Sequence, residues 1–278
     1  MFKKYFLPFS VLLLSVTIAG CNQTSENTND PAEFIHSHTY HKLKFDYQDG
    51  TCGADSVPGL RLFTRFLIPS DSTTGGKKIA RFVEDFMVRN IHSYTDSTFI
   101  GTSPIGNNRL KSAYEDLRTA YYDFRESFPD ALGCWEIEMN GDTIFTSPQV
   151  ISYGLAQFSY LGGAHPNTFT TFYLFDSKTG EELNPLLFFD DTTQLLDKVE
   201  STFRRVENIS PSANLENSGY FLENGKFFLP ANFIFSEDGV LIHYNPYEIA
   251  PYVKGPISFT IPYHELKGNL KEELLFGQ

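Results

Sequence analysis

The sequence offers one set of side chains suited to acid–base chemistry, and its members lie far apart in the chain. His165 supplies an imidazole and Glu248 a carboxylate, and Tyr247 or His243 would complete the set. Such groups exchange protons with a substrate only when they lie within hydrogen-bond reach of it. The sequence gives no distance between them, and it contains no nucleophile elbow, glycine-rich phosphate loop or zinc-ligand motif. Catalysis is therefore the weaker hypothesis for these residues.

The loop around Glu248 is better suited to binding. Residues 245–252 read Asn-Pro-Tyr-Glu-Ile-Ala-Pro-Tyr, so two prolines and two tyrosines surround one carboxylate. Tyrosine offers a large contact area at a small cost in conformational entropy, and a carboxylate pairs with a basic group. The candidate binding residues are Pro246, Tyr247, Glu248 and Tyr252. The alternative is a structural corner, in which the tyrosine rings pack inward and Glu248 caps backbone groups.

A second unusual segment, residues 160–167, reads Tyr-Leu-Gly-Gly-Ala-His-Pro-Asn. Glycine permits positive φ or a close backbone approach, and the residue before a proline is pushed towards extended geometry. We interpret the segment as a hinge between two halves of the chain. The alternative for its histidine is a ring that hydrogen-bonds across the hinge and holds the halves in register. The hinge residues are Gly162, Gly163, His165, Pro166 and Asn167.

Two cysteines, Cys52 and Cys134, fall in the region expected to fold. Disulfides persist in exported proteins, so these two are predicted to pair, with two buried free thiols as the alternative. Neither has a second ligand at metal-binding spacing. His36 and His38 would share one face of a strand, with His41 nearby, but we favour ordinary exposed histidines. No metal and no cofactor is expected.

The N-terminus has the features of an export signal with a lipid attachment site. Lys3 and Lys4 precede an apolar run too short to favour a membrane span, and small residues then lead to Cys21. Ile-Ala-Gly-Cys resembles a bacterial lipobox, whose cysteine carries acyl chains such as palmitate and becomes the first residue of the mature protein. We expect residues 1–20 to be a lipoprotein signal peptide and residues 21–33 a flexible tether. The folded part would then be exported and lipid-anchored in the bacterial cell envelope, with the outer membrane favoured.

The chain is acidic, with a formal net charge of −12 at pH 7. Loss of residues 1–20 removes Lys3 and Lys4, which changes the formal net charge from −12 to −14. An acidic surface repels nucleic-acid phosphate and anionic lipid headgroups and favours cationic partners. We therefore expect no nucleic-acid partner. The simpler alternative is that the acidity only keeps a surface lipoprotein soluble.

The elements that must position these residues follow one another in a mixed order. Helices are predicted where apolar residues recur every three to four positions, over residues 79–91, 108–128 and 193–206. Strands are predicted over residues 36–47, 60–69, 133–139, 143–145, 148–160, 168–175, 227–235, 240–244 and 257–261. In addition, Asn140-Gly141 predicts a hairpin turn, and Gly75-Gly76 is expected to break the chain before the first helix.

This order favours an α+β fold. We expect two mixed α/β subdomains with largely antiparallel sheets, each packed against helices. The N-terminal α+β domain is placed at residues 34–157 and the C-terminal α+β domain at residues 158–278.

Five segments carry a resemblance to a known family. They are residues 160–167, the turn at residues 176–180, Leu-Leu-Phe-Phe at 186–189, residues 247–252 and Ile-Pro-Tyr at 261–263. Together they resemble the extracellular region of RsiV-type anti-sigma factors, over roughly residues 36–266. The same RsiV-like domain pair occurs in bacterial lipoproteins and beside peptidoglycan deacetylase domains. The resemblance implies a smaller α/β domain followed by a C-terminal domain, and RsiV-type members sense lysozyme by binding it directly.

The sequence departs from these families in showing no sigma-factor-binding segment, no transmembrane helix and no deacetylase domain. Signalling by membrane cleavage and deacetylase chemistry are therefore not carried over. What the resemblance implies is a lipoprotein that acts as a non-enzymatic binding module for lysozyme or a similar cationic cell-wall hydrolase. The alternatives are a peptidoglycan- or glycan-binding envelope lipoprotein and a cell-wall hydrolase that uses His165 and Glu248.

Overall fold

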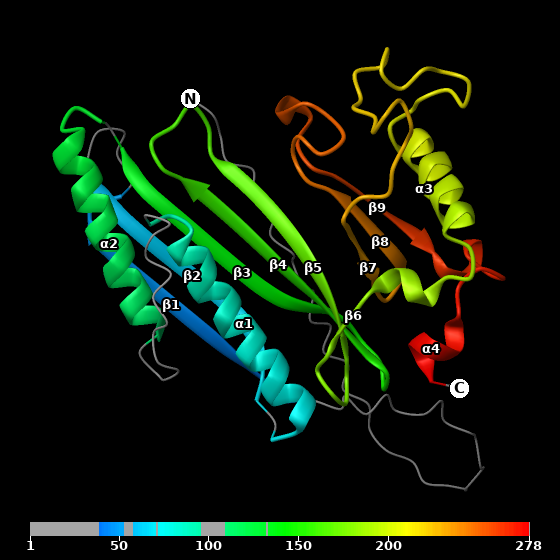
Figure 1. Cartoon of the computed structure of the whole chain (residues 1–278), viewed down its shortest axis with the longest axis horizontal. Helices are drawn as coiled ribbons and strands as arrows, with labels where there is room; N and C mark the ends of the chain where they lie inside the picture. Colours follow the sequence, from blue (N-terminus) through cyan, green and yellow to red (C-terminus); the bar gives the residue numbers. More distant parts are fainter. Residues whose placement is uncertain (1–38, 53–57, 71, 96–108, 132, 278) are drawn as a thin grey trace, which may run out of the picture. The chain divides into compact units, whose positions relative to one another are not determined.

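The computed structural model describes residues 39–52, 58–70, 72–95, 109–131 and 133–277. Within these residues the chain forms two β-sheets with accompanying helices, which confirms the predicted α+β class (Figure 1). By their contacts, residues 35–278 form one compact unit. The expected signal peptide, Cys21, the tether and the pair His36 and His38 lie outside the described residues.

The first sheet has six strands in the order β1-β2-β3-β4-β5-β6. The strands are β1 (Tyr40–Gly50), β2 (Gly59–Pro69), β3 (Cys134–Thr146), β4 (Val150–Tyr160), β5 (Asn167–Asp176) and β6 (Glu182–Leu183). Neighbouring strands are antiparallel except β2 and β3, which are parallel. A parallel pair needs a long crossover, and this one contains helices α1 (Thr74–His92) and α2 (Arg109–Ser127).

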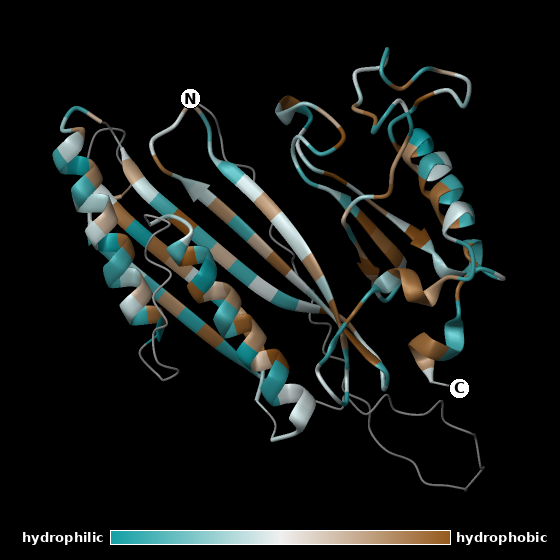
Figure 2. Ribbon diagram, in the orientation of Figure 1, coloured by the Kyte–Doolittle hydropathy of each residue, from teal (hydrophilic) through white to brown (hydrophobic). Residues whose placement is uncertain are grey.

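Helices α1 and α2 cover one face of this sheet (Figure 1). The helix α1 forms as predicted because its apolar residues recur at helical spacing. The members of this stripe without exposed surface are Ile79, Val83, Met87 and Ile91. They pack against the alternate residues of the strands that face the helices, among them Met139, Tyr153 and Phe175. Figure 2 shows the corresponding alternation of hydrophilic and hydrophobic residues along the strands.

The prediction that Gly75 and Gly76 break the chain before α1 is wrong. Both glycines lie in the first turn of this helix. Thr73 caps this turn by accepting a hydrogen bond from the Gly76 N–H at 3.0 Å. A Cβ on Gly75 would lie 2.6 Å from the carbonyl oxygen of Ser177. The glycine therefore allows the start of α1 to approach the turn after β5.

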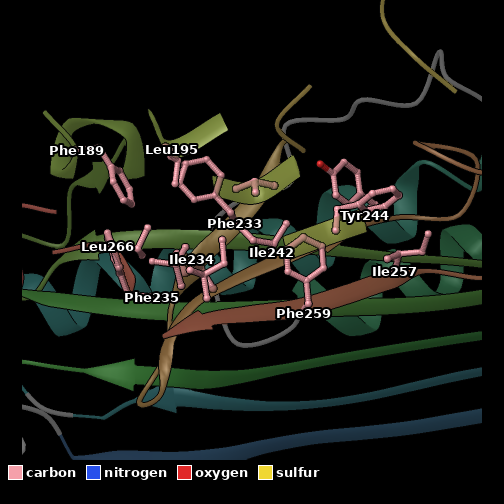
Figure 3. Close-up of a cluster of buried hydrophobic side chains, with 14 of the residues drawn as sticks. Phe189, Leu195, Phe233, Ile234, Phe235, Ile242, Tyr244, Ile257, Phe259 and Leu266 are labelled. Carbon is pink, nitrogen blue, oxygen red and sulfur yellow. The ribbon is translucent and has the colours of Figure 1, made fainter. Parts of the chain in front are cut away.

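The second sheet is antiparallel and contains β7 (Asn232–Phe235), β8 (Gly239–Tyr244) and β9 (Ile257–Pro262) in that order. Helix α3 (Thr192–Val206) packs against it through the apolar side chains Leu195, Val199 and Phe203. Figure 3 shows this core, in which Leu195 of α3 lies among side chains of the second sheet such as Phe233 and Phe259. The shorter helices are η1 (Pro185–Phe188), η2 (Tyr252–Lys254), η3 (Tyr263–Glu265) and α4 (Glu272–Phe276).

The predicted hairpin at Asn140-Gly141 is wrong, because β3 continues through both residues. Gly141 pairs with Phe66 of β2 on one side and with Leu155 of β4 on the other. A Cβ at this position would lie 2.8 Å from both a ring carbon of Phe66 and the hydroxyl of Tyr153. The glycine is needed for close packing in the core and not for a turn.

The hinge interpretation of residues 160–167 is also wrong. Ser159 pairs with Asn167, so the residues between them close a hairpin that joins β4 to β5 of the same sheet. Gly162 supplies the positive φ of this loop, at +83°. The expected boundary between residues 157 and 158 falls inside β4, and the sheet continues across it.

Cys52 and Cys134 form a disulfide, which confirms the predicted pairing. The bond joins the segment after β1 to the first residue of β3, with Cα atoms 5.5 Å apart and a sequence separation of 82. The segment from Cys52 to Cys134, which contains β2 and the crossover helices α1 and α2, is therefore closed by a covalent link.

Candidate functional site

The structure brings His165 to the same place as the tyrosines of the 245–252 loop, which the sequence separates by about eighty positions. The exposed His165 ring stacks on Tyr252 with centroids 4.1 Å apart and an interplanar angle of 23°. Its Nδ1 donates to the Pro166 carbonyl at 3.0 Å, and the Tyr252 hydroxyl donates to that same oxygen at 2.8 Å. The β4–β5 hairpin and the loop after β8 are thus joined at this point.

Tyr247 completes the cluster. Its ring lies 5.5 Å from Tyr252 and 6.5 Å from His165, measured between centroids. The side chain is 57% exposed, and Val253, which follows Tyr252, is 91% exposed. We call His165, Tyr247, Tyr252 and Val253 the aromatic loop surface. The structural-corner alternative requires the tyrosine rings to pack inward. In the structure neither Tyr247 nor Tyr252 is buried in the core.

Tyr247 has φ +68°, a left-handed conformation that is strained for a bulky residue. The surrounding contacts explain how this conformation is held. The Glu248 carboxylate accepts a hydrogen bond from the Asn245 N–H at 2.8 Å and another from the Ala231 N–H at 3.2 Å. Glu248 is therefore a backbone cap, as the alternative for that residue predicts. Among the described contacts, none joins Glu248 to His165.

A second anchor holds the far end of this loop. Lys254 donates to the Tyr220 hydroxyl at 2.6 Å, and that hydroxyl donates to Glu207 at 2.6 Å. The Lys254 ammonium also lies 4.2 Å from the centroid of the Tyr220 ring. The hydrogen bond to Tyr220 raises the pKa of Lys254 above its usual range. The loop is thus tied to the residue that follows α3 as well as to the β4–β5 hairpin.

Two buried asparagines, Asn232 and Asn245, connect the second sheet to the edge of β5, and these contacts were not predicted from the sequence. The side-chain amide of Asn245 accepts from the Thr170 N–H at 2.8 Å and donates to the Thr170 carbonyl at 2.9 Å. The amide oxygen of Asn232 accepts from the Phe172 N–H at 3.1 Å. These amides satisfy backbone groups that a neighbouring strand would otherwise pair. In the sequence, the only feature that could have indicated these contacts is a polar residue at the end of an otherwise apolar strand.

His243 lies beside Asn245 and is 8% exposed. Its Nδ1 is 2.6 Å from the Ser258 hydroxyl, and its Nε2 is 3.3 Å from the amide oxygen of Asn245. Burial lowers the pKa of His243, while the hydrogen bond with Asn245 and the charge of Glu248 act in the opposite direction. The sequence suggested His243 only as an accessory to His165, and it did not suggest Ser258.

A groove opens where His243 and Asn245 face the first sheet. It has a volume of about 380 Å³, and we call it the inter-sheet groove. Its walls are Asn140, Ala156, Gln157, Phe158, Thr168, Phe169, Thr170, His243, Asn245, Pro246 and Pro256. A neighbouring hollow of about 230 Å³ shares Asn140, Ala156 and Thr170 with it. Both lie against strands β3, β4 and β5.

The buried His243 should make the stability of the fold depend on pH. Because its pKa is lowered in the folded protein, the unfolded chain binds more protons below the ordinary histidine value of 6.5. The free energy of unfolding should therefore be at its full value above pH 6.5 and fall as the pH drops from there through the lower pKa of the folded state. Denaturant unfolding of wild type and His243→Gln between about pH 5 and pH 8 checks this.

The variant should show a flatter dependence than wild type in this window. The matched control is His264→Gln, which changes an exposed histidine. Equal slopes for wild type and His243→Gln would contradict the assignment of the pH dependence to His243.

The described residues contain no group of three or more histidine, cysteine, aspartate or glutamate side chains placed to hold a metal ion. In the same part of the chain, no helix is both long and apolar enough to cross a membrane. The candidate site consists of the aromatic loop surface and, beside it, the inter-sheet groove, which the buried His243 lines.

The fold and this site define an α+β protein in which a six-stranded mixed sheet is coupled to a small antiparallel sheet. Residues 187–264, which include α3, the second sheet and the loop with Tyr247, match the family described as "Protein of unknown function (DUF3298)". No curated protein gave a significant match. The finer resemblance to RsiV-type ectodomains stays a prediction.

Solved structures of two members of that family have a similar fold. One, from Bacteroides fragilis, is 20% identical with a TM-score of 0.63 and covers 84% of this chain and 95% of its own. The other, from Pseudomonas aeruginosa, is 16% identical with a TM-score of 0.57 and covers 86% of this chain and 98% of its own. At these identities the likeness concerns the fold alone.

Proposed function

We propose that this protein is an envelope lipoprotein, anchored through Cys21, whose folded part is a binding module for a cationic cell-wall hydrolase such as lysozyme. The partner contacts the aromatic loop surface. The observation that carries the proposal is the convergence of two loops from different sheets on one group of rings, formed by the exposed His165 and Tyr247 and the half-buried Tyr252.

The rigidity of this surface supports a binding role. Tyr247 is exposed, yet its strained backbone is fixed by the Glu248 cap, and Tyr252 is fixed by its bond to Pro166. A preorganised surface loses little conformational freedom on binding, so more of the contact energy appears as affinity. Tyrosines in such positions are frequent energetic centres of protein interfaces.

The charge of the chain supports the choice of partner. A formal net charge of −12 favours the approach of a basic protein and disfavours an acidic one. Complementary charge mainly accelerates association and makes it sensitive to ionic strength, because salt screens exposed charges beyond about 10 Å at 0.1 M. Binding of lysozyme should therefore weaken as salt is raised.

Replacing Tyr247 should remove most of the affinity without disturbing the fold. We choose Tyr247→Asn, because asparagine tolerates positive φ while it lacks the ring. Loss of a central tyrosine should weaken lysozyme binding by about 2 kcal/mol, which corresponds to roughly 30-fold. Titration calorimetry of lysozyme into the mature protein, at low and moderate salt, measures the change.

The matched control is Phe128→Ala. Phe128 has nearly the same exposure, 58% against 57% for Tyr247, but it follows the end of α2. The affinity of the Phe128→Ala variant for lysozyme should equal that of wild type. Absence of binding by folded wild type, or equal losses in the two variants, would contradict the proposal.

A further inference from the structure

We propose that Ser258, His243 and Asn245 form a second site, in which Ser258 is a nucleophile towards small carboxylic esters held at the inter-sheet groove. This activity goes beyond the proposed binding function and uses none of the residues of the aromatic loop surface. Ser258 and His243 touch the reacting atoms, and Asn245 is a positioning residue.

The sheet register places the first two residues side by side. His243 of β8 and Ser258 of β9 are direct cross-strand partners, so their side chains project from the same face of the second sheet. The Ser258 hydroxyl lies 2.6 Å from Nδ1 of His243. This is the separation expected between a nucleophile and its general base. Ser258 is exposed, and His243 and the nearby Pro256 line the groove.

The hydrogen bonds of Asn245 determine which nitrogen of His243 carries the proton. Asn245 uses its Nδ2 to donate to the Thr170 carbonyl and its Oδ1 to accept from the Thr170 N–H, so the orientation of the amide is fixed by the backbone of β5. The same Oδ1 faces Nε2 of His243 at 3.3 Å and can only accept. In the neutral ring the proton is therefore on Nε2, and Nδ1 is free to accept the proton of Ser258.

The surroundings also suit a base that becomes charged during the reaction. Burial keeps the His243 imidazole neutral at pH 7 and so able to accept a proton. The charge of Glu248 favours the imidazolium once it forms. Glu248 is itself held by the Asn245 and Ala231 N–H groups. Thr170, Asn245 and Glu248 thus support the ring through one connected set of hydrogen bonds.

The reaction balances with water as the only co-reactant. The Ser258 proton moves to Nδ1 as Oγ bonds to the ester carbonyl carbon; the bond from that carbon to the alcohol oxygen then breaks, and the alcohol leaves with the proton from Nδ1. Water next gives a proton to Nδ1 while its oxygen attacks the acyl carbon. The carboxylic acid leaves, and the proton returns to Oγ of Ser258.

The test is labelling of the full mature protein with a fluorophosphonate, followed by peptide mass spectrometry. Wild type should be modified at Ser258 and should hydrolyse 4-nitrophenyl acetate. Ser258→Ala should lose both properties, and His243→Gln should react at least about 100-fold more slowly. The control Ser212→Ala changes another exposed serine and should behave as wild type.

Ser258→Cys keeps the test decisive even if His243→Gln unfolds. Its thiol should be alkylated by iodoacetamide faster than a cysteine placed at Ser212, because His243 withdraws the thiol proton. Equal alkylation rates, labelling that persists in Ser258→Ala, or no labelling of folded wild type would overturn the proposal.

Discussion

Replacing Cys52 and Cys134 together by serine is expected to lower the free energy of unfolding by about 4 kcal/mol. The disulfide closes a sequence separation of 82, which contains β2, α1 and α2. In the unfolded chain such a link removes more conformational freedom than a link across a short loop, so its loss favours unfolding strongly. The Cα separation of 5.5 Å lies in the usual range for disulfides, so the folded state accommodates the bond.

Guanidinium denaturation of the oxidised protein, the reduced protein and the double variant measures this effect. The reduced protein and the double variant should unfold at similar, lower denaturant concentrations, and a reducing agent should leave the double variant unchanged. Equal midpoints for the oxidised protein and the double variant would contradict a stabilising role for the bond.

Gly141→Ala is expected to destabilise the fold by about 1–3 kcal/mol, as overpacking of a core commonly does. The added methyl group would lie 2.8 Å from the Tyr153 hydroxyl and from a ring carbon of Phe66. Neither neighbour can move freely. Phe66 and Tyr153 have no exposed surface, and the Tyr153 hydroxyl donates to the Leu67 carbonyl at 2.6 Å.

The matched control is Gly163→Ala, in the β4–β5 hairpin loop. A Cβ on Gly163 meets no atom within 4 Å, so this variant should unfold within about 0.5 kcal/mol of wild type. Thermal or denaturant unfolding compares the two. Equal stabilities of Gly141→Ala and Gly163→Ala would contradict the expectation that the core of the first sheet has no room for a methyl group at Gly141.

The parts of the fold that sequence patterns predicted are those fixed by local periodicity. The apolar stripe of α1 and the run of β2 each bury one face, so their spacing alone identifies them. Helix α3, predicted over residues 193–206, begins one residue earlier at Thr192, where Asp191 caps it. The disulfide was predicted because only two cysteines lie in the region expected to fold, in a chain expected to be exported.

The errors arose where distant residues decide the structure. Asn140-Gly141 has the composition of a tight turn, but the rings above Gly141 come from β2 and β4, which local sequence does not bring together. The predicted pair His165 and Glu248 also failed, since Glu248 caps backbone groups and His165 stacks on Tyr252. The Ser258–His243 pair depends on the register of β8 and β9, and hydrophobic alternation of period two does not distinguish registers that differ by two residues.

Hydrogen exchange of the mature protein, with and without lysozyme, tests the central claim about the aromatic loop surface most directly. Lysozyme should slow exchange at backbone amides in both converging loops, near His165 and from Tyr247 to Val253. Amides of α1 and α2 should exchange as in the free protein. Protection confined to other elements, or no protection at saturating lysozyme, would contradict the assignment of this surface as the binding site.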